Sequence, residues 1–150
     1  MKFTKMQGLG NDYVYIDCFS EQVAKPEELA IRIADRHFGV GGDGLILICP
    51  SEIAPVRMRM FNADGSEGKM CGNGARCVAR YAYDHGLVTS RSFDIETGAG
   101  IRHAEVGESL VTIDMGEAVL DGELEEAIMV DGKATRMTAV NVGNPHAVYL

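Results

Sequence analysis

The chain has 150 residues, and its 14 lysines and arginines against 22 aspartates and glutamates give a formal net charge of −8 at pH 7. Proteins bind a nucleic-acid backbone through clustered Lys and Arg side chains, so this acidic composition argues against a nucleic-acid partner. With 46% hydrophobic and 24% charged residues, the composition is that of an ordinary globular protein, and the length predicts one domain.

The N-terminal residues contain no apolar stretch long enough for a signal peptide, and no run reaches the ~18 apolar residues of a membrane-spanning helix. We therefore expect a cytoplasmic protein with no membrane partner, in which cysteines stay reduced. The cysteines and histidines lack the spacing of a metal site, so no metal is expected. The four cysteines are either all small buried residues or include one that acts as a thiol: Cys18, Cys49, Cys71 and Cys77.

Two strands and a helix are predicted in the first forty residues. Residues 2–7 and 13–19 have the alternating and β-branched patterns of strands, and the residues between them form a glycine-rich turn. The helix begins at Pro26, a residue tolerated in a first helical turn, and its apolar spacing extends to Phe38. Gly39 ends it.

The middle of the chain predicts two strands and a second helix. Residues 45–49 are a continuous apolar run, typical of a strand buried on both faces. Residues 56–60 alternate apolar side chains with arginines, which predicts a half-buried strand. From residue 72 to residue 85 apolar side chains recur at a spacing of three and four around nearly the whole circumference. Such a helix belongs in the interior, and Gly86 ends it.

The last third of the sequence predicts mainly strands. Three short ones are separated by glycine-containing turns: residues 92–96, 101–106 and 110–115. The acidic residues 116–135 are poorly periodic, and the one element expected there is a short helix near 123–129. Residues 137–142 and 147–150 read as two further strands. The elements together predict an α+β fold in which a mostly antiparallel or mixed sheet wraps around a central apolar helix.

A glycine-rich string follows the first predicted helix. Gly39-x-Gly41-x-x-Gly44 matches the dinucleotide-binding fingerprint, which requires a strand before it and a helix after it. Here the helix precedes and the strand follows, so we expect a helix end and a tight turn, and no nucleotide. Asp43 in this turn either points into a pocket or is an ordinary turn residue.

The most unusual segment, residues 62–77, carries four glycines and two asparagines between a strand and the buried helix. Cys71 immediately precedes that helix, where free N–H groups favour a thiolate and can also hold a carboxylate. This effect is typically ~0.3–1 kcal/mol, too little to ionise a thiol at neutral pH, so a nearby base or a water-excluding cavity must help. Gly72 and Gly74 weaken the first helical turn and offer bare backbone to a ligand. Cys77 is expected in the core.

Three asparagines lie at the ends of predicted elements: Asn11, Asn62 and Asn144. Because an amide both donates and accepts hydrogen bonds, converging amides suit a zwitterionic ligand that carries a carboxylate and an ammonium group. Arg76 is a candidate partner for one carboxylate only if its side chain leans back toward the helix start. His146, taken alone, is an exposed residue of a structural turn.

Five separated motifs carry a resemblance to a known family. They are Gly8-Leu9-Gly10-Asn11-Asp12, Gly41-Gly42-Asp43-Gly44, Phe61-Asn62-Ala63-Asp64-Gly65-Ser66, Met70-Cys71-Gly72-Asn73-Gly74-Ala75-Arg76-Cys77 and Gly143-Asn144-Pro145-His146. In this order, and over essentially the whole chain, they resemble the N-terminal half of the diaminopimelate epimerase family.

The resemblance implies an isomerase of lysine and cell-wall precursor synthesis that needs no pyridoxal phosphate or other cofactor. Such an enzyme interconverts LL- and meso-diaminopimelate with two cysteines, one from each of two similar domains, and acts as a homodimer. The resemblance makes Cys71 the acid/base of this half, with His146 tuning or orienting the thiol. The backbone of Gly72 and Asn73 would hold the α-carboxylate. The three amides would contact the substrate: Asn11, Asn62 and Asn144.

Two departures from the family qualify this prediction. Many members carry a glutamine where Gly44 stands, and the second half, with its own cysteine, is absent from these 150 residues. We therefore expect residues 1–150 to be the N-terminal domain of a two-domain epimerase, with little or no activity alone. The alternatives are a proline or hydroxyproline racemase of the same fold, the related isomerase of phenazine synthesis, which lacks the cysteine, and a thiol-containing redox-sensing or ligand-binding module without catalysis.

Overall fold

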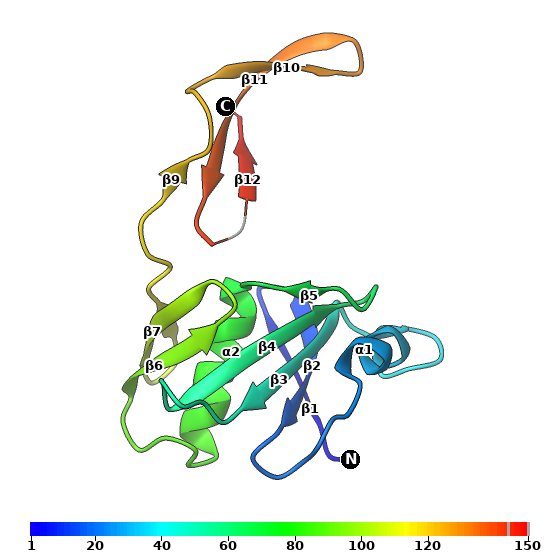
Figure 1. Ribbon diagram of the computed structural model, residues 1–150, viewed down its shortest axis with the longest axis vertical. Helices are drawn as coiled ribbons and strands as arrows, with labels where there is room; N and C mark the ends of the chain where they lie inside the picture. The colour runs from blue at the N-terminus through cyan, green and yellow to red at the C-terminus, as the bar shows by residue number, and fades with distance from the viewer. Residues whose placement is uncertain (144, 150) are drawn as a thin grey trace. The chain divides into compact units, whose positions relative to one another are not determined.

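The computed structural model describes residues 1–143 and 145–149. The chain divides into two compact units, Met1–Asp114 and Met115–Leu150. In Figure 1 the first unit runs from blue to yellow-green and the second from yellow to red. Within the described residues, no helix has the length and the hydrophobicity that crossing a bilayer requires. The assignment of residues 1–150 to one domain of a two-domain enzyme stays a prediction.

The first unit is a mixed sheet with two helices. Its strands are β1 (Thr4–Gly8), β2 (Asn11–Asp17), β3 (Gly44–Cys49), β4 (Val56–Asn62), β5 (Glu67–Gly68), β6 (Ser92–Thr97), β7 (Gly100–Val106) and β8 (Val111–Ile113). The strand order is β1-β2-β3-β4-β6-β7-β8, and β5 pairs with β4. The pairs β2–β3 and β4–β6 are parallel, whereas the other pairs of this sheet are antiparallel.

Helix α2 (Gly72–Asp84) is the element around which this sheet curls. The strands β1 and β8 stand at opposite ends of the strand order, yet both pack against α2. The helix can be enclosed because its inward positions are small or apolar: Ala75, Cys77, Val78, Ala79 and Ala82 are buried. The prediction of an α+β fold with a sheet wrapped around an apolar helix is confirmed, and so is the core position of Cys77.

The central strand β3 separates the two helices. It is buried on both faces, as the continuous apolar run predicted. Leu45 and Leu47 belong to the core cluster beneath α1 (Pro26–Ala34), whereas Ile46 lies against the first turn of α2. The predicted alternation in β4 is also confirmed, because its apolar residues are buried while its arginines are exposed or partly exposed.

Helix α1 is shorter than predicted. It ends at Ala34, and Phe38, expected on its apolar face, is 94% exposed. The reason is the side chain of Asp35, whose carboxylate accepts hydrogen bonds from the backbone N–H groups of His37 and Phe38 at 2.7 and 2.8 Å. These local bonds offer the chain an alternative to further helix.

The second unit consists of four strands: β9 (Val119–Leu120), β10 (Glu126–Val130), β11 (Lys133–Asn141) and β12 (Pro145–Val148). All its pairs are antiparallel. The strand predicted at 137–142 is confirmed in β11, the strand predicted at 147–150 overlaps β12 at residues 147 and 148, and the helix predicted near 123–129 is wrong. Asp131 and Gly132 have φ angles of 49° and 77°, the left-handed geometry of a two-residue hairpin turn. This turn pairs β10 with β11 instead.

Gly44 begins β3 with a φ of 155°. A Cβ atom at this position would overlap the carbonyl oxygen of Phe61 and lie 3.1 Å from the Cα of Asn62 on β4. With this backbone no side chain fits at Gly44. A glutamine, which many family members have here, would require the start of β3 to move.

We therefore expect Gly44→Ala to destabilise the protein more than Gly86→Ala. Gly86 also has a positive φ of 71°, but nothing lies within 4 Å of its added Cβ, so that control carries only the conformational cost of about 1–2 kcal/mol. The clash at Gly44 should add at least about 1 kcal/mol. Urea unfolding measures the free energy of unfolding of both variants. An equal loss of stability in the two variants would contradict the steric account.

Candidate functional site

The thiol of Cys71 caps the start of α2, as its position before the helix predicted. The residue has an extended backbone, and its Sγ accepts a hydrogen bond from the N–H of Gly74 at 3.3 Å. Its own S–H donates to the Oδ1 of Asn11 at 3.3 Å. The side chain is neither in the core nor fully in solvent, because Cys71 is partly buried. The sulfur thus lies between the first residue of β2 and the first turn of α2.

The first turn of α2 presents backbone N–H groups beside this sulfur. The N–H of Ala75 bonds to the carbonyl of Cys71 at 2.8 Å, and that of Gly74 bonds to its Sγ. For the N–H groups of Gly72 and Asn73, the structure gives no acceptor among residues 1–143 and 145–149. Free N–H groups at the positive end of a helix are a site for a carboxylate.

Asn11 connects the thiol to the sheet. Its Nδ2 donates to the carboxylate of Asp43 at 2.6 Å, while its Oδ1 accepts from Cys71 and, at 3.4 Å, from the Nδ2 of Asn73. A carboxylate can only accept, so the NH₂ end of the amide must face Asp43. The oxygen must therefore face the thiol, and Asp43 sets which group Cys71 meets.

Asp43 is itself held by a group of charges. It accepts from the N–H of Asp12 at 3.0 Å and pairs with Arg36 at 3.1 Å. Asp12 pairs with Arg36 at 2.7 Å and with Lys5 at 2.8 Å. Hydrogen bonds from Arg36 and then Lys5 hold the pKa of the Asp12 carboxyl well below its usual range. The glycine-rich turn thus has a role that the sequence left open: Asp43 supports Asn11.

Tyr13 of β2, two residues after Asn11, is 5% exposed. Burial raises its pKa to about 12, and the negative charge that Cys71 carries as a thiolate adds to this shift. The phenol therefore stays neutral across the physiological range beside the sulfur. Neither its aromatic pattern nor its spacing marked it as a site residue, since Tyr13 reads as an ordinary strand residue in the sequence.

Arg76 leans back toward the helix start, which was the condition for a role near the thiol. Its guanidinium donates to the Oδ1 of Asn73, one helical turn earlier. Gly74 also affects the packing of α2. A Cβ there would lie 2.6 Å from the terminal methyl of the fully buried Ile46, so a larger residue would push this methyl of β3 aside.

The other predicted site residues are Asn62, His146 and Asn144. Asn62 pairs with Gly44 in the register of β3 and β4, at the same edge of the sheet as Asn11, but its Nδ2 donates to Ser66 at 2.9 Å within the β4–β5 turn. His146 is an exposed residue of β12 in the second unit. Asn144 lies outside the described residues. Their roles stay predictions.

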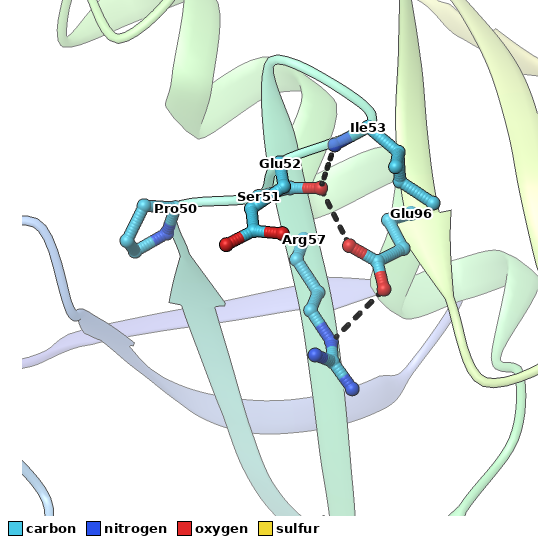
Figure 2. Close-up of a pocket in the computed structure, with 6 residues that line it drawn as sticks. All are labelled: Pro50, Ser51, Glu52, Ile53, Arg57 and Glu96. Atoms are coloured by element: carbon cyan, nitrogen blue, oxygen red, sulfur yellow. Dashed lines mark hydrogen bonds and ion pairs between the residues drawn. The ribbon is translucent and has the colours of Figure 1, made fainter.

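A separate cavity of about 520 Å³ lies where β3 ends and β4 begins, at the opposite end of these strands from Asn11. Figure 2 shows its lining: Pro50, Ser51, Glu52, Ile53, Arg57 and Glu96. The Ser51 hydroxyl donates to Glu96 at 2.5 Å, and Glu96 also pairs with Arg57 at 3.5 Å. Since Arg57 is opposite Glu96 in the short parallel pairing of β4 with β6, these bonds hold two strands together. We assign the cavity no chemistry.

Comparison with known proteins decides the family. The family model described as diaminopimelate epimerase matches residues 3–120. The diaminopimelate epimerase of Acetivibrio thermocellus is 49% identical over 99% of this chain and 59% of its own length. That of Geobacillus thermodenitrificans is 53% identical over 98% of this chain and 57% of its own length. This chain belongs to the diaminopimelate epimerase family. It spans somewhat more than half of the length of these relatives.

Solved structures show that the fold of the epimerase family extends to other enzymes. A probable proline racemase from Agrobacterium radiobacter K84 has a TM-score of 0.76 at 16% identity, over 98% of this chain and 51% of that one. A hydroxyproline epimerase from Agrobacterium vitis has a TM-score of 0.75 at 15% identity, over 98% and 50%. At these identities the likeness establishes the fold alone. The predicted family resemblance is confirmed, and the roles of single residues are not tested by it.

The ion pairs behind Asn11 predict a specific response to acid. The pKa of Asp12 in the folded protein lies below its usual 3.8. The stability that the ionised Asp12 contributes is therefore complete above about pH 3.8 and is lost as the pH falls below that value. We expect Asp12→Asn to be less stable than wild type at about pH 6, and this difference to shrink toward about pH 2. Urea unfolding at several pH values measures it. A difference that stays constant would contradict the ion-pair account.

Proposed function

We propose that this chain supplies one half of the site of a cofactor-independent diaminopimelate epimerase, with Cys71 as an acid/base. The observation that carries the proposal is the position of its sulfur, which contacts the Asn11 amide and the N–H of Gly74 beside two N–H groups without a described acceptor. An exposed turn thiol would have none of these partners. Membership of the family supports diaminopimelate as the substrate.

The proposed reaction inverts the α-carbon with two thiols on opposite faces. A thiolate removes the α-proton, so the Cα–H bond breaks and an S–H bond forms. The opposing thiol then gives its proton to the other face of Cα, which forms the new Cα–H bond and inverts the centre. The negative charge that develops passes into the α-carboxylate, which the N–H groups of Gly72 and Asn73 would stabilise.

The partners of Cys71 suit a group that both gives and takes a proton. The bond to Asn11 Oδ1 requires the S–H and therefore exists only in the thiol. The bond from the Gly74 N–H persists in the thiolate, where a charged acceptor strengthens it. The thiol thus has both partners, and the thiolate keeps the Gly74 N–H. Because Asp43 fixes the amide, the same oxygen faces the sulfur in both states and favours the thiol over the thiolate.

We extend the proposal to the other residues of the family motifs. Asn11, Asn62 and Asn144 would contact the polar groups of the substrate, and His146 would tune or orient the thiol. We further propose a cytoplasmic homodimer that serves lysine and peptidoglycan precursor synthesis, with the second thiol in a second domain. The second candidate function is racemisation of proline or hydroxyproline, which the shared fold favours.

Substitutions at two cysteines separate chemistry from stability. In the full-length protein we expect Cys71→Ser to abolish epimerisation with little loss of stability, because serine keeps the helix cap but is a far weaker acid than a thiol. Cys71→Ala should also be inactive and lose about 0.5–2 kcal/mol of stability with the cap. Interconversion of LL- and meso-diaminopimelate and urea unfolding provide the two readouts.

The matched control is Cys77→Ala, six residues further along α2. That side chain is buried, so its loss should lower stability while turnover persists. Full activity of Cys71→Ser, or loss of turnover through Cys77→Ala in a folded protein, would refute the assignment of Cys71. Proline in place of diaminopimelate in the same assay tests the second candidate.

The half-site proposal predicts that residues 1–150 do not turn over LL-diaminopimelate by themselves. One thiol can exchange a proton on one face but has no partner to deliver a proton to the other. Chiral chromatography of the substrate after prolonged incubation measures the product. Formation of meso-diaminopimelate by these residues alone would overturn the requirement for a second domain.

A further inference from the structure

Two further thiols lie in the first unit, away from Cys71 and the residues that contact it. Cys49 is the last residue of β3, and Cys18 follows Asp17, the last residue of β2. These strands are parallel with Asp17 opposite Ile48, and the N–H of Cys18 bonds to the carbonyl of Ile48 at 2.8 Å. The register therefore places Cys18 and Cys49 side by side.

The two side chains share a face of the sheet. Both pack against the core cluster beneath α1, which includes Ile16 of β2 and Leu47 of β3. These residues precede the two cysteines by two positions each, and such residues point to the same face of a strand. Both cysteines are only partly buried, so a small molecule can reach them.

This pair is distant from the proposed epimerase chemistry along the sheet. Asn11, which contacts the Cys71 thiol, is the first residue of β2, whereas Cys18 follows the last one. The full length of β2 separates the two places. The reaction proposed for Cys71 therefore makes no use of Cys18 or Cys49.

The surroundings make the two thiols unequal. The pKa of Cys49 is lowered, first by the hydrogen bond that Cys18 donates and then by the charges of Arg59 and Arg57 on the neighbouring β4, whereas burial and Glu67 oppose this shift. The pKa of Cys18 is raised by the same neighbour, by burial and by Asp17. Cys49 is thus the better nucleophile, and Cys18 keeps its proton.

We propose that Cys18 and Cys49 form a redox-modification site that a hydroperoxide converts into a disulfide between β2 and β3. The Cys49 sulfur attacks the peroxide, so an S–O bond forms, the O–O bond breaks and Cys49 becomes a sulfenic acid, while hydrogen peroxide leaves as water and an organic hydroperoxide as its alcohol. The Cys18 sulfur then attacks the Cys49 sulfur, so the S–S bond forms, the S–O bond breaks and water leaves. The peroxide accepts the two electrons that the thiols lose.

The geometry of neighbouring strands permits this bond. Adjacent strands lie about 4.7–4.9 Å apart, within the Cα–Cα range of about 4.4–6.8 Å that a disulfide spans. Both residues stand at strand ends, where the backbone can adjust. The closed segment would contain α1, Arg36 and Asp43, so oxidation would tether the part of the chain that supports Asn11.

The test uses the reduced full-length protein, treated with hydrogen peroxide and then with an alkylating agent. We expect a Cys18–Cys49 linked peptide by mass spectrometry, which dithiothreitol removes. Cys18→Ser should leave Cys49 as a sulfenic acid that dimedone labels. Cys49→Ser should give no linked peptide. Cys77→Ser, a substitution of the buried thiol, should not change the linkage.

Two results would overturn the inference. One is a wild-type protein in which both cysteines remain free thiols while peroxide oxidises Cys71. The other is a Cys18→Ser variant in which peroxide leaves Cys49 without a dimedone adduct, because it would show that Cys49 is not the sulfur that peroxide attacks. The wild-type measurement needs no substitution, so a variant that fails to fold does not rescue the proposal.

Discussion

The structure of the candidate site depends on the amide of Asn11, held between a carboxylate and a thiol. Asp43 can only accept, so it takes the NH₂ end and leaves the oxygen for Cys71. Arg36 and Lys5 keep this arrangement in place through Asp12 and Asp43. These charged residues thereby determine that the Cys71 sulfur meets the oxygen of the Asn11 amide and not its NH₂ group. The N-terminus of α2 supplies the complementary feature for a carboxylate, the N–H groups of Gly72 and Asn73, which have no acceptor among the described residues.

The fold brings these groups together through the curl of the sheet. Since α2 is apolar on most sides, strands from both ends of the order close around it, and its first turn emerges at the edge where β2 and β3 begin. Gly74 allows the close approach to Ile46 that sets the position of this turn. The packing of α2 against the sheet therefore also determines where the Cys71 thiol lies.

The features predicted correctly from the sequence are those with local causes. The apolar run of β3, the periodicity of α2 and the position of Cys71 before it are readable over a few residues. The contacts of Asp43 with Asn11 and of Arg36 with Asp12 join residues 32 and 24 positions apart, and no local pattern encodes them. Local polar turns caused the errors, because Asp35 ends α1 early and Asp131 with Gly132 forms a hairpin where a helix was expected.

Protection of Cys71 by substrate tests the central claim most directly. The rate at which iodoacetamide alkylates Cys71 in the full-length protein should fall when diaminopimelate is added, whereas Cys18 and Cys49, at the other end of β2 and β3, should react at unchanged rates. Peptide mapping resolves the individual cysteines in one sample. An alkylation rate of Cys71 that saturating diaminopimelate leaves unchanged would contradict the account.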